Sequence, residues 1–374
     1  MNIETPIAPL SPPRRTLLGP GPSPVPQSVL DAMGKPTLGH LDPAFLGIMN
    51  EVRAMLRSVM CTDNELTFPM SGTGSAGMET CVVNLVEPGD KVLVGINGVF
   101  GMRLAEVARR AGAVVHTVEQ EWGRALDPEA LRALKTEGPF KVMCVVHAET
   151  STGAVSDLSA CKEVASELGA MLLVDCVTSL GGIPLEIDAL GVDAAYSGTQ
   201  KCLSCPPGLS PVTFSERAME ALRSRKTPVQ SWYLDLSLVA SYWGDDRAYH
   251  HTAPIQAIYG LHEALRLVLE EGLCERHARH ARNSEALWSG LEEMGLELAV
   301  EKTERLVPLT AVKVPDGVSE GQARAELLEK YDLEIGGGLG PLKGKVWRIG
   351  LMGAGSSEAN VELVLKAMKD VIGR

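Results

Sequence analysis

Three short segments of the chain carry side chains whose types and order could do chemistry. The first, residues 71–77, has the sequence SGTGSAG, follows an apolar run at 66–70 and precedes a helical pattern. Glycines and hydroxyls at a helix N-terminus form a site for an anion such as a phosphate. The spacing also matches the G-x-G-x-x-G of dinucleotide sites, but those need an acidic residue at the end of the next strand. The next predicted strand, 91–96, ends without one. This favours a phosphate site over a dinucleotide site, with a plain glycine turn as the structural alternative.

The other two segments each end in a side chain that is costly to bury. Lys201 follows SGTQ at the end of a short strand pattern. A lysine there must lose part of its hydration to act as a nucleophile, and small neighbours leave room for a cofactor ring. Asp175 closes the apolar run at 171–174, where a carboxylate is costly unless it meets a positive partner. Taken singly, each has an ordinary interpretation, a solvated surface lysine and a buried structural cap.

The order of the three segments is more specific than any one of them. A glycine-rich anion site, then a strand-end Asp175, then Lys201 at 26 residues further on suits pyridoxal 5′-phosphate, PLP. In such a site the helix terminus holds the phosphate, the aspartate pairs with the pyridine nitrogen and the lysine binds the aldehyde. These residues therefore predict a PLP site.

An alternating α/β fold must position these side chains. Apolar runs alternate with helical patterns from about residue 43 to residue 215, which predicts a mainly parallel sheet wrapped by helices. One helix is expected to begin after Asp157 as its N-cap. The predicted strands cover residues 66–70, 91–96, 114–118, 141–146, 171–175, 193–197 and 211–214.

After residue 250 the pattern changes to a smaller α+β unit. Two long helical patterns, roughly 253–271 and 274–294, precede strands expected near 296–300, 309–314 and 346–351. We expect an extended N-terminal arm at 1–21, because its prolines fix φ and remove hydrogen-bond donors. A large PLP-binding domain is expected at 22–271 and a small C-terminal domain at 272–374.

Composition excludes several other classes of protein. The 374 residues are 45% hydrophobic and carry a formal net charge of −12, so there is no basic footprint for nucleic acid or anionic lipid. No stretch approaches the roughly 18 apolar residues of a membrane span, and the N-terminus lacks a signal-peptide pattern. Eight irregularly spaced cysteines predict a reduced, cytoplasmic protein. No metal site is expected, because the pair Cys202 and Cys205 has no second pair to complete one.

The chain resembles the class V, fold type I aminotransferases, and within them the alanine–glyoxylate and serine–pyruvate enzymes. The resemblance runs from LGPGP at 18–22, through YSGTQK at 196–201, to WRIGL at 347–351. Further matching segments lie at 71–74, 87–90, 97–98, 151–153, 174–175, 179–182, 224–226, 249–252 and 337–340. It implies a PLP-transferase fold with a seven-stranded sheet. It also implies ping-pong transamination between alanine or serine and glyoxylate or pyruvate.

The resemblance also assigns roles to individual residues. Lys201 would form the Schiff base and move the substrate proton, and Asp175 would keep the pyridine nitrogen protonated. Arg348 would bind the substrate carboxylate through two parallel hydrogen bonds, with Gly21 and Thr150 as further substrate contacts. Cofactor contacts are implied for Thr73, Gly74, Ser75, Phe100, Thr150, Val177 and Gln200, and, from the other subunit of a homodimer, for Tyr249 and Thr252.

Two residues depart from the pattern of the enzymes that the chain resembles. Phe100 replaces a tryptophan that stacks on the cofactor ring, and Ser75 replaces a histidine. Phenylalanine keeps a stacking face but has less area and no N–H donor. His40 is a hypothesis for the site entrance, with an ordinary loop histidine as the simpler interpretation.

Related activities stay open. Class V transaminases acting on ureidoglycine, on an aminophosphonate, or on pyridoxamine with pyruvate share the same motifs, although Arg348 favours an amino donor with a carboxylate. A cysteine desulfurase would need a cysteine on a mobile loop well beyond the lysine. The only cysteine after Cys205 is Cys274, which lies in a helical pattern.

Overall fold

A seven-stranded sheet forms the centre of the chain. The computed structural model describes residues 8–244 and 246–373. Strand β10 runs antiparallel to both of its neighbours, and the remaining adjacent pairs are parallel. The prediction of a mainly parallel seven-stranded sheet is confirmed. In spatial order the strands are β2 (Leu66–Ser71), β10 (Leu209–Phe214), β9 (Ala194–Tyr196), β8 (Met171–Asp175), β5 (Val142–Val146), β3 (Lys91–Ile96) and β4 (Val114–Glu119).

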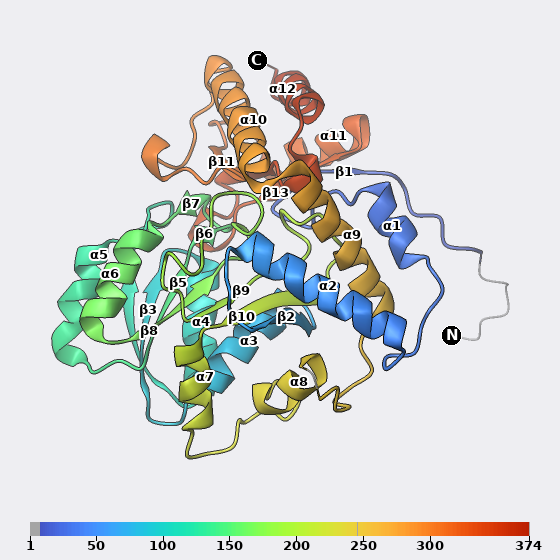
Figure 1. Cartoon of the computed structure of the whole chain (residues 1–374). Helices are drawn as coiled ribbons and strands as arrows, with labels where there is room; N and C mark the ends of the chain where they lie inside the picture. Colours follow the sequence, from blue (N-terminus) through green and yellow to red (C-terminus); the bar gives the residue numbers. More distant parts are fainter. Residues whose placement is uncertain (1–7, 245, 374) are drawn as a thin grey trace, which may run out of the picture.

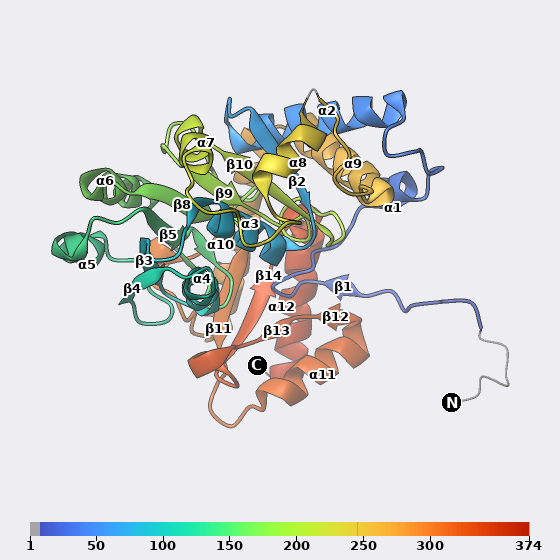
Figure 2. The ribbon, with the colours of Figure 1, turned by 90° about the horizontal axis from the view of Figure 1, so that it is seen from below.

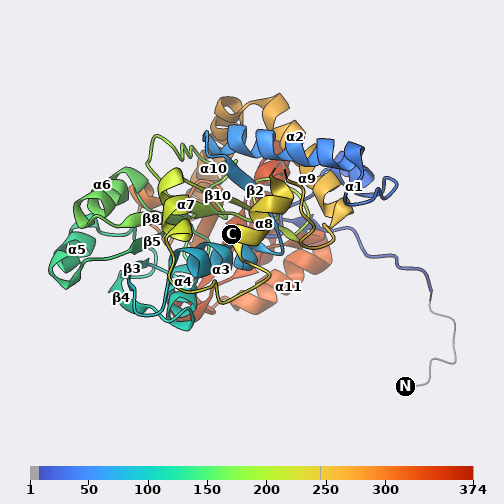
Figure 3. The ribbon, with the colours of Figure 1, turned by 60° about the horizontal axis from the view of Figure 1, so that its bottom comes forward.

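Helices cover this sheet, as expected for parallel strands whose two faces are both apolar. All five residues of β5 and of β8 are buried. Helices α5 and α6 lie beside one end of the sheet, and α1, α2 and α9 lie beside the other (Figures 1 and 3). The helices are α1 (Gln27–Met33), α2 (Pro43–Met60), α3 (Gly74–Leu85), α4 (Val99–Arg110), α5 (Pro128–Arg132), α6 (Leu158–Leu168), α7 (Glu216–Arg223), α8 (Leu236–Trp243) and α9 (Ile255–Glu271).

Local capping explains where several of these helices begin and end. The carboxylate of Asp157 accepts hydrogen bonds from Ser159 N at 2.8 Å and Ala160 N at 3.3 Å, which confirms it as the N-cap of α6. Asp42 caps α2 in the same way, with Pro43 at the first helical position. At the far end of α6, Gly169 takes a left-handed φ of 66°.

The C-terminal part is an α+β layer. An antiparallel sheet of order β11 (Leu309–Lys313), β14 (Val346–Gly350) and β13 (Gly336–Gly337) packs with α10 (Leu273–Glu293), α11 (Glu320–Tyr331) and α12 (Glu358–Ile372). Short strands pair as β1 (Thr16–Leu17) with β12 (Leu333–Glu334) and as β6 (Ala148–Glu149) with β7 (Ala154–Val155). Short 3-10 helices lie at Ala133–Glu137, Lys302–Glu304, Gly340–Leu342 and Gly353–Gly355.

The prediction of a strand near 296–300 is wrong. In this segment only Leu298 forms an isolated bridge, to Val312. Leu296, Leu298 and Val300 are buried and alternate with more exposed residues, which is the pattern that suggested a strand. Alternation of apolar and polar residues indicates that one face of a segment is buried, but a strand also needs consecutive residues paired with a neighbouring strand.

Two large hydrophobic cores support the proposed division of the chain, and a small third cluster joins Ala148 and Cys202 to Leu306, Leu309 and Met352 across it. One large core extends from Val29 to Val268 and the other joins Leu18 to residues between Leu287 and Met368. We propose that the domains divide between α9 and α10, at 271/272. Of the proposed arm, residues 1–7 lie outside the described residues. Residues 8–15 are exposed and lead away from the body (Figure 2), whereas Leu18 is fully buried in the C-terminal core.

Candidate active site

Side chains that the sequence predicts to be functional gather at the C-terminal edge of the central sheet. Asp175 is the last residue of β8, and Lys201 follows β9 in a turn. The carboxyl ends of parallel strands share one edge, which is where ligands of open α/β sheets bind. Helix α3 begins at Gly74, directly after β2, and brings its N-terminus to the same region.

A cavity of about 240 Å³ lies at this edge. Three of its lining residues, Met78, Arg103 and Tyr196, were not singled out by the sequence, and the others were. The lining consists of Thr73, Gly74, Ser75, Met78, Phe100, Arg103, Asp175, Val177, Tyr196, Gln200 and Lys201. Predicted residues up to 128 positions apart in the sequence, from Thr73 to Lys201, therefore line one cavity.

Asp175 is held from both sides of its carboxylate. The hydroxyl of Tyr196 donates to Oδ2 at 2.6 Å, and the amide of Val177 donates to Oδ1 at 2.9 Å. Burial raises the pKa of Asp175 to about 6, although these two hydrogen bonds lower it. Tyr196 pairs with Asp175 in the register of β9 and β8. The tyrosine directly precedes SGTQK in the sequence, but only the strand register places it beside the carboxylate.

Lys201 is buried, with 8% of its surface exposed. Its amine donates to the main-chain carbonyl of Pro20. Burial lowers the pKa of Lys201 to about 8, and the positive charge of Arg348 acts in the same direction. Gly21 lies against this side chain: a Cβ there would come within 2.8 Å of Lys201 Nζ. The glycine thus leaves the space that the lysine occupies.

The N-terminus of α3 forms the other end of the cavity. Gly72 has a φ of 143°, and a Cβ on Gly74 would contact Ser197 O and Val177 Cγ2 at 3.5 Å. The side-chain oxygen of Gln200 is buried and has no hydrogen-bond partner among the residues the structure describes. Because helix N-termini expose N–H groups and the positive end of the helix dipole, this end of the cavity suits an anion.

Arg348 reaches the region from the C-terminal domain. It lies on β14, donates from Nε to Gly337 O at 2.7 Å and from Nη1 to Thr150 O at 2.8 Å. Burial lowers the pKa of Arg348 to about 10, and the negative charge of Glu149 opposes this shift. Thr150 meets Thr178 through its hydroxyl at 3.2 Å. Neither Arg348 nor Thr150 lines the cavity.

Tyr249, Thr252 and His40 lie away from the cavity of their own chain. Tyr249 is 62% exposed, and its ring lies 5.2 Å from that of His40. Thr252 is also exposed, just before α9. These positions leave Tyr249 and Thr252 exposed to contact by another molecule.

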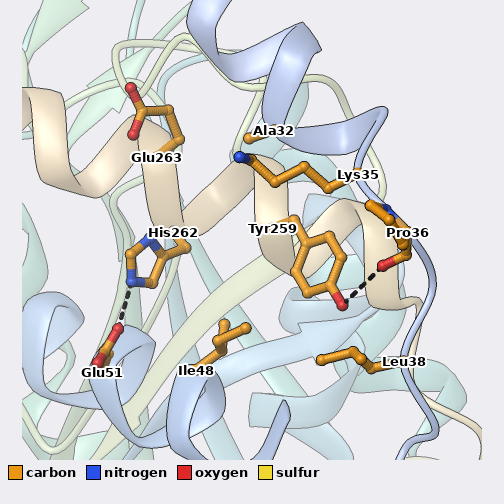
Figure 4. A pocket seen from close by; sticks show the side chains of 9 residues that line it. All are labelled: Ala32, Lys35, Pro36, Leu38, Ile48, Glu51, Tyr259, His262 and Glu263. Atoms are coloured by element: carbon orange, nitrogen blue, oxygen red, sulfur yellow. Dashed lines mark hydrogen bonds and ion pairs between the residues drawn. The ribbon is translucent and has the colours of Figure 1, made fainter. Parts of the chain in front are cut away.

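A larger cavity elsewhere contains none of the predicted residues. It measures about 540 Å³ and lies between α1, α2 and α9 (Figure 4). His262 pairs with Glu51 at 2.6 Å, and the Tyr259 hydroxyl donates to Pro36 O at 3.3 Å. The larger cavity thus holds no counterpart of the Lys201 and Asp175 arrangement.

Comparisons with known proteins show which family the chain is similar to. The model of the family described as Aminotransferase class-V matches residues 15–344. An alanine–glyoxylate aminotransferase of Drosophila melanogaster is 41% identical, over 100% of this chain and 96% of the relative. An (S)-ureidoglycine–glyoxylate transaminase of Bacillus subtilis is 40% identical, over 97% and 91%.

A solved structure extends the similarity to the whole fold. The crystal structure of an alanine–glyoxylate aminotransferase from Nostoc sp. superposes with a TM-score of 0.97 at 50% identity, over 99% of this chain and 98% of that one. The family match and the full-length relatives lead to one conclusion. The chain belongs to the class-V aminotransferase family.

Proposed function

We propose that this aminotransferase uses PLP to exchange an amino group between alanine or serine and glyoxylate or pyruvate. The observation that carries the proposal is the shared cavity of Lys201 and Asp175, closed at its other end by the N-terminus of α3. A buried lysine whose pKa falls to about 8 is neutral in a larger fraction at physiological pH than a solvated lysine.

The residues of the cavity fit the cofactor. Phe100 and Val177 supply apolar surface for a planar ring, and Asp175 supplies a carboxylate for a ring nitrogen. The unpartnered oxygen of Gln200 belongs to an amide that can turn its NH₂ group toward an anion at Thr73, Gly74 and Ser75. The cavity therefore offers partners for the ring, the ring nitrogen and the phosphate of PLP, and Lys201 for its aldehyde.

The chemistry divides between cofactor and chain. PLP, when bound, acts as the electron sink that stabilises negative charge at the substrate α-carbon. Lys201 would hold the cofactor and then move a proton at the α-carbon, a task that suits an amine with a pKa of about 8. Asp175, oriented by Tyr196 and Val177, would keep the ring nitrogen protonated.

The proposed substrates rest on Arg348 and on the relatives. Two contacts to Gly337 O and Thr150 O fix the guanidinium, whose remaining N–H groups can bind a carboxylate. The named activity of the Drosophila relative supports alanine with glyoxylate. The Bacillus relative is almost equally similar, so ureidoglycine with glyoxylate is the second candidate.

We further propose a homodimer in which Tyr249 and Thr252 reach the cofactor phosphate of the partner subunit. Trp232 and Tyr249 expose 63% and 62% of their surface, which is unusual for large aromatic side chains and favours an interface. Light scattering on the chain as it elutes from a size-exclusion column tests whether it is a dimer.

The eight free thiols support the proposed cytoplasmic location. No helix in the described ranges has the length and hydropathy for crossing a bilayer.

Visible absorption spectra of the purified chain test the activity. We expect a yellow band after incubation with PLP, bleaching with L-alanine or L-serine, and recovery on addition of glyoxylate. A band that only ureidoglycine bleaches would favour the second candidate. No band after addition of PLP would refute the assignment of Lys201.

A further inference from the structure

Glu149 is a buried carboxylate that the proposed chemistry does not use. It is 0% exposed and lies at the end of β6, in the turn that leads to β7. Its Oε2 accepts from Phe100 N at 3.1 Å and from Gly101 N at 3.4 Å. Its Oε1 accepts from Ser151 N at 3.0 Å and from Ser151 Oγ at 2.6 Å. Every one of these partners is a donor, so the site is built for a carboxylate.

Two of the donors to Glu149, the amides of Phe100 and Gly101, lie in the first turn of α4. The first N–H groups of any helix lack partners within the helix. In α4, the amide of Val99 donates to Ser151 Oγ at 2.9 Å, and the next two amides donate to Glu149. The turn between β6 and β7 thus accepts hydrogen bonds from the first three amides of a helix about 50 residues earlier in the chain. A negative charge at this end also interacts favourably with the helix dipole.

Gly98 shows how closely the turn and the helix approach. A Cβ on Gly98 would lie 2.4 Å from Glu149 Cγ and from Ser151 Oγ. No side chain larger than hydrogen fits between them without a shift. Two residues into the helix, Phe100 lines the proposed cofactor cavity. The position of its ring therefore depends on where the first turn of α4 is held.

The same turn also contacts the proposed substrate-binding arginine. Thr150, between Glu149 and Ser151, accepts from Arg348 Nη1 at 2.8 Å through its main-chain oxygen. One short turn thus contacts both the main chain of Phe100 and the guanidinium of Arg348 from the C-terminal domain. A change in the turn would reach both groups.

We propose that Glu149 is a positioning residue that fixes the first turn of α4 and so sets the ring of Phe100 against the cofactor. The placement of the Phe100 ring against the cofactor rests on the proposed PLP site. The attachment of the first turn of α4 by Glu149 concerns the chain alone and needs no cofactor. Separate measurements test the attachment of α4 and the placement of the Phe100 ring.

Amide hydrogen exchange tests the attachment of α4 without any cofactor. Glu149→Gln places an NH₂ group against donors, and we expect about tenfold faster exchange over residues 97–104. Asp157→Ala is the matched control, because it removes a capping carboxylate from α6 and should leave residues 97–104 unchanged. Should Glu149→Gln fail to fold, Ser151→Ala removes only the hydroxyl link and carries the same expectation. Unchanged exchange in the folded variant would overturn the proposal.

A double-mutant cycle tests whether Glu149 acts through Phe100. We expect Glu149→Gln and Phe100→Ala each to weaken PLP binding about tenfold, and the double variant to bind no more weakly than the weaker single variant. The visible circular dichroism of bound PLP should also change in Glu149→Gln but not in Asp157→Ala. Additive losses, or an unchanged dichroic band, would overturn the positioning role. If the unsubstituted chain bound no PLP, the proposed function would fail, while the exchange result would still decide the attachment of α4.

Discussion

The hydroxyl of Tyr196 donates a hydrogen bond of 2.6 Å to the carboxylate of Asp175. The two residues face each other across the parallel strands β9 and β8, and both are buried. Burial raises the pKa of Asp175 to about 6, and this hydrogen bond is the largest opposing influence. A buried neighbour thus controls the charge of the group assigned to the cofactor nitrogen.

Tyr196→Phe should move the acid limb of the pH–rate profile to higher pH. Without the hydroxyl, the pKa of Asp175 rises further, so a higher pH is needed to ionise it. We expect a loss of about tenfold in kcat/KM at neutral pH. Tyr242→Phe is the control, since its hydroxyl contacts His40 O. An unshifted acid limb would show that Tyr196 does not govern Asp175.

Attachment of PLP to Lys201 should have a pH dependence centred near pH 8. The neutral amine is the nucleophile, and its fraction rises as pH increases through a pKa of about 8. An ordinary lysine would give a midpoint at about 10.4. Stopped-flow absorbance between pH 6 and pH 11 measures the midpoint. Lys201→Ala should show neither attachment nor turnover, and substantial turnover in that variant would contradict the assignment.

Gly21→Ala should slow covalent attachment of PLP while the chain still folds. Its Cβ would lie 2.8 Å from Lys201 Nζ, so the lysine must leave its position. Gly89→Ala is a matched control, because Gly89 has a similarly positive φ of 91° but no neighbour within 4 Å of the added Cβ. Both variants should lose stability from backbone strain. Equal PLP attachment in the two variants would remove Gly21 from the site.

Arg348→Lys should raise KM for alanine about 10-fold to 100-fold, with a smaller effect on kcat. Lysine keeps the charge but cannot make the planar pair of hydrogen bonds to a carboxylate. Arg324→Lys, a change at a nearby arginine paired with Glu320, is the control. Steady-state kinetics at saturating PLP measure both variants. An unchanged KM for alanine would point to a different carboxylate-binding residue.

Local sequence signals predicted the elements of the fold well. The strands Lys91–Ile96 and Met171–Asp175 occupy the predicted residues, and α6 begins after its predicted cap. These features depend on neighbouring residues: turn glycines, a capping carboxylate and a continuous apolar run. The segment near 296–300 shows the limit of such prediction. Its alternation of apolar and polar residues reflects burial of one face, but the segment forms only an isolated bridge.

For the candidate site, the sequence by itself determined which residue types stand at the ends of the strands and helices. Lys201, Asp175 and the glycine segment before α3 were recognisable because each motif is contiguous. Only the tertiary structure placed Tyr196 beside Asp175, Glu149 at the start of α4 and Arg348 against Thr150. Strand register and domain packing are set by the burial of many side chains that are distant in sequence. No local window of the sequence contains that information.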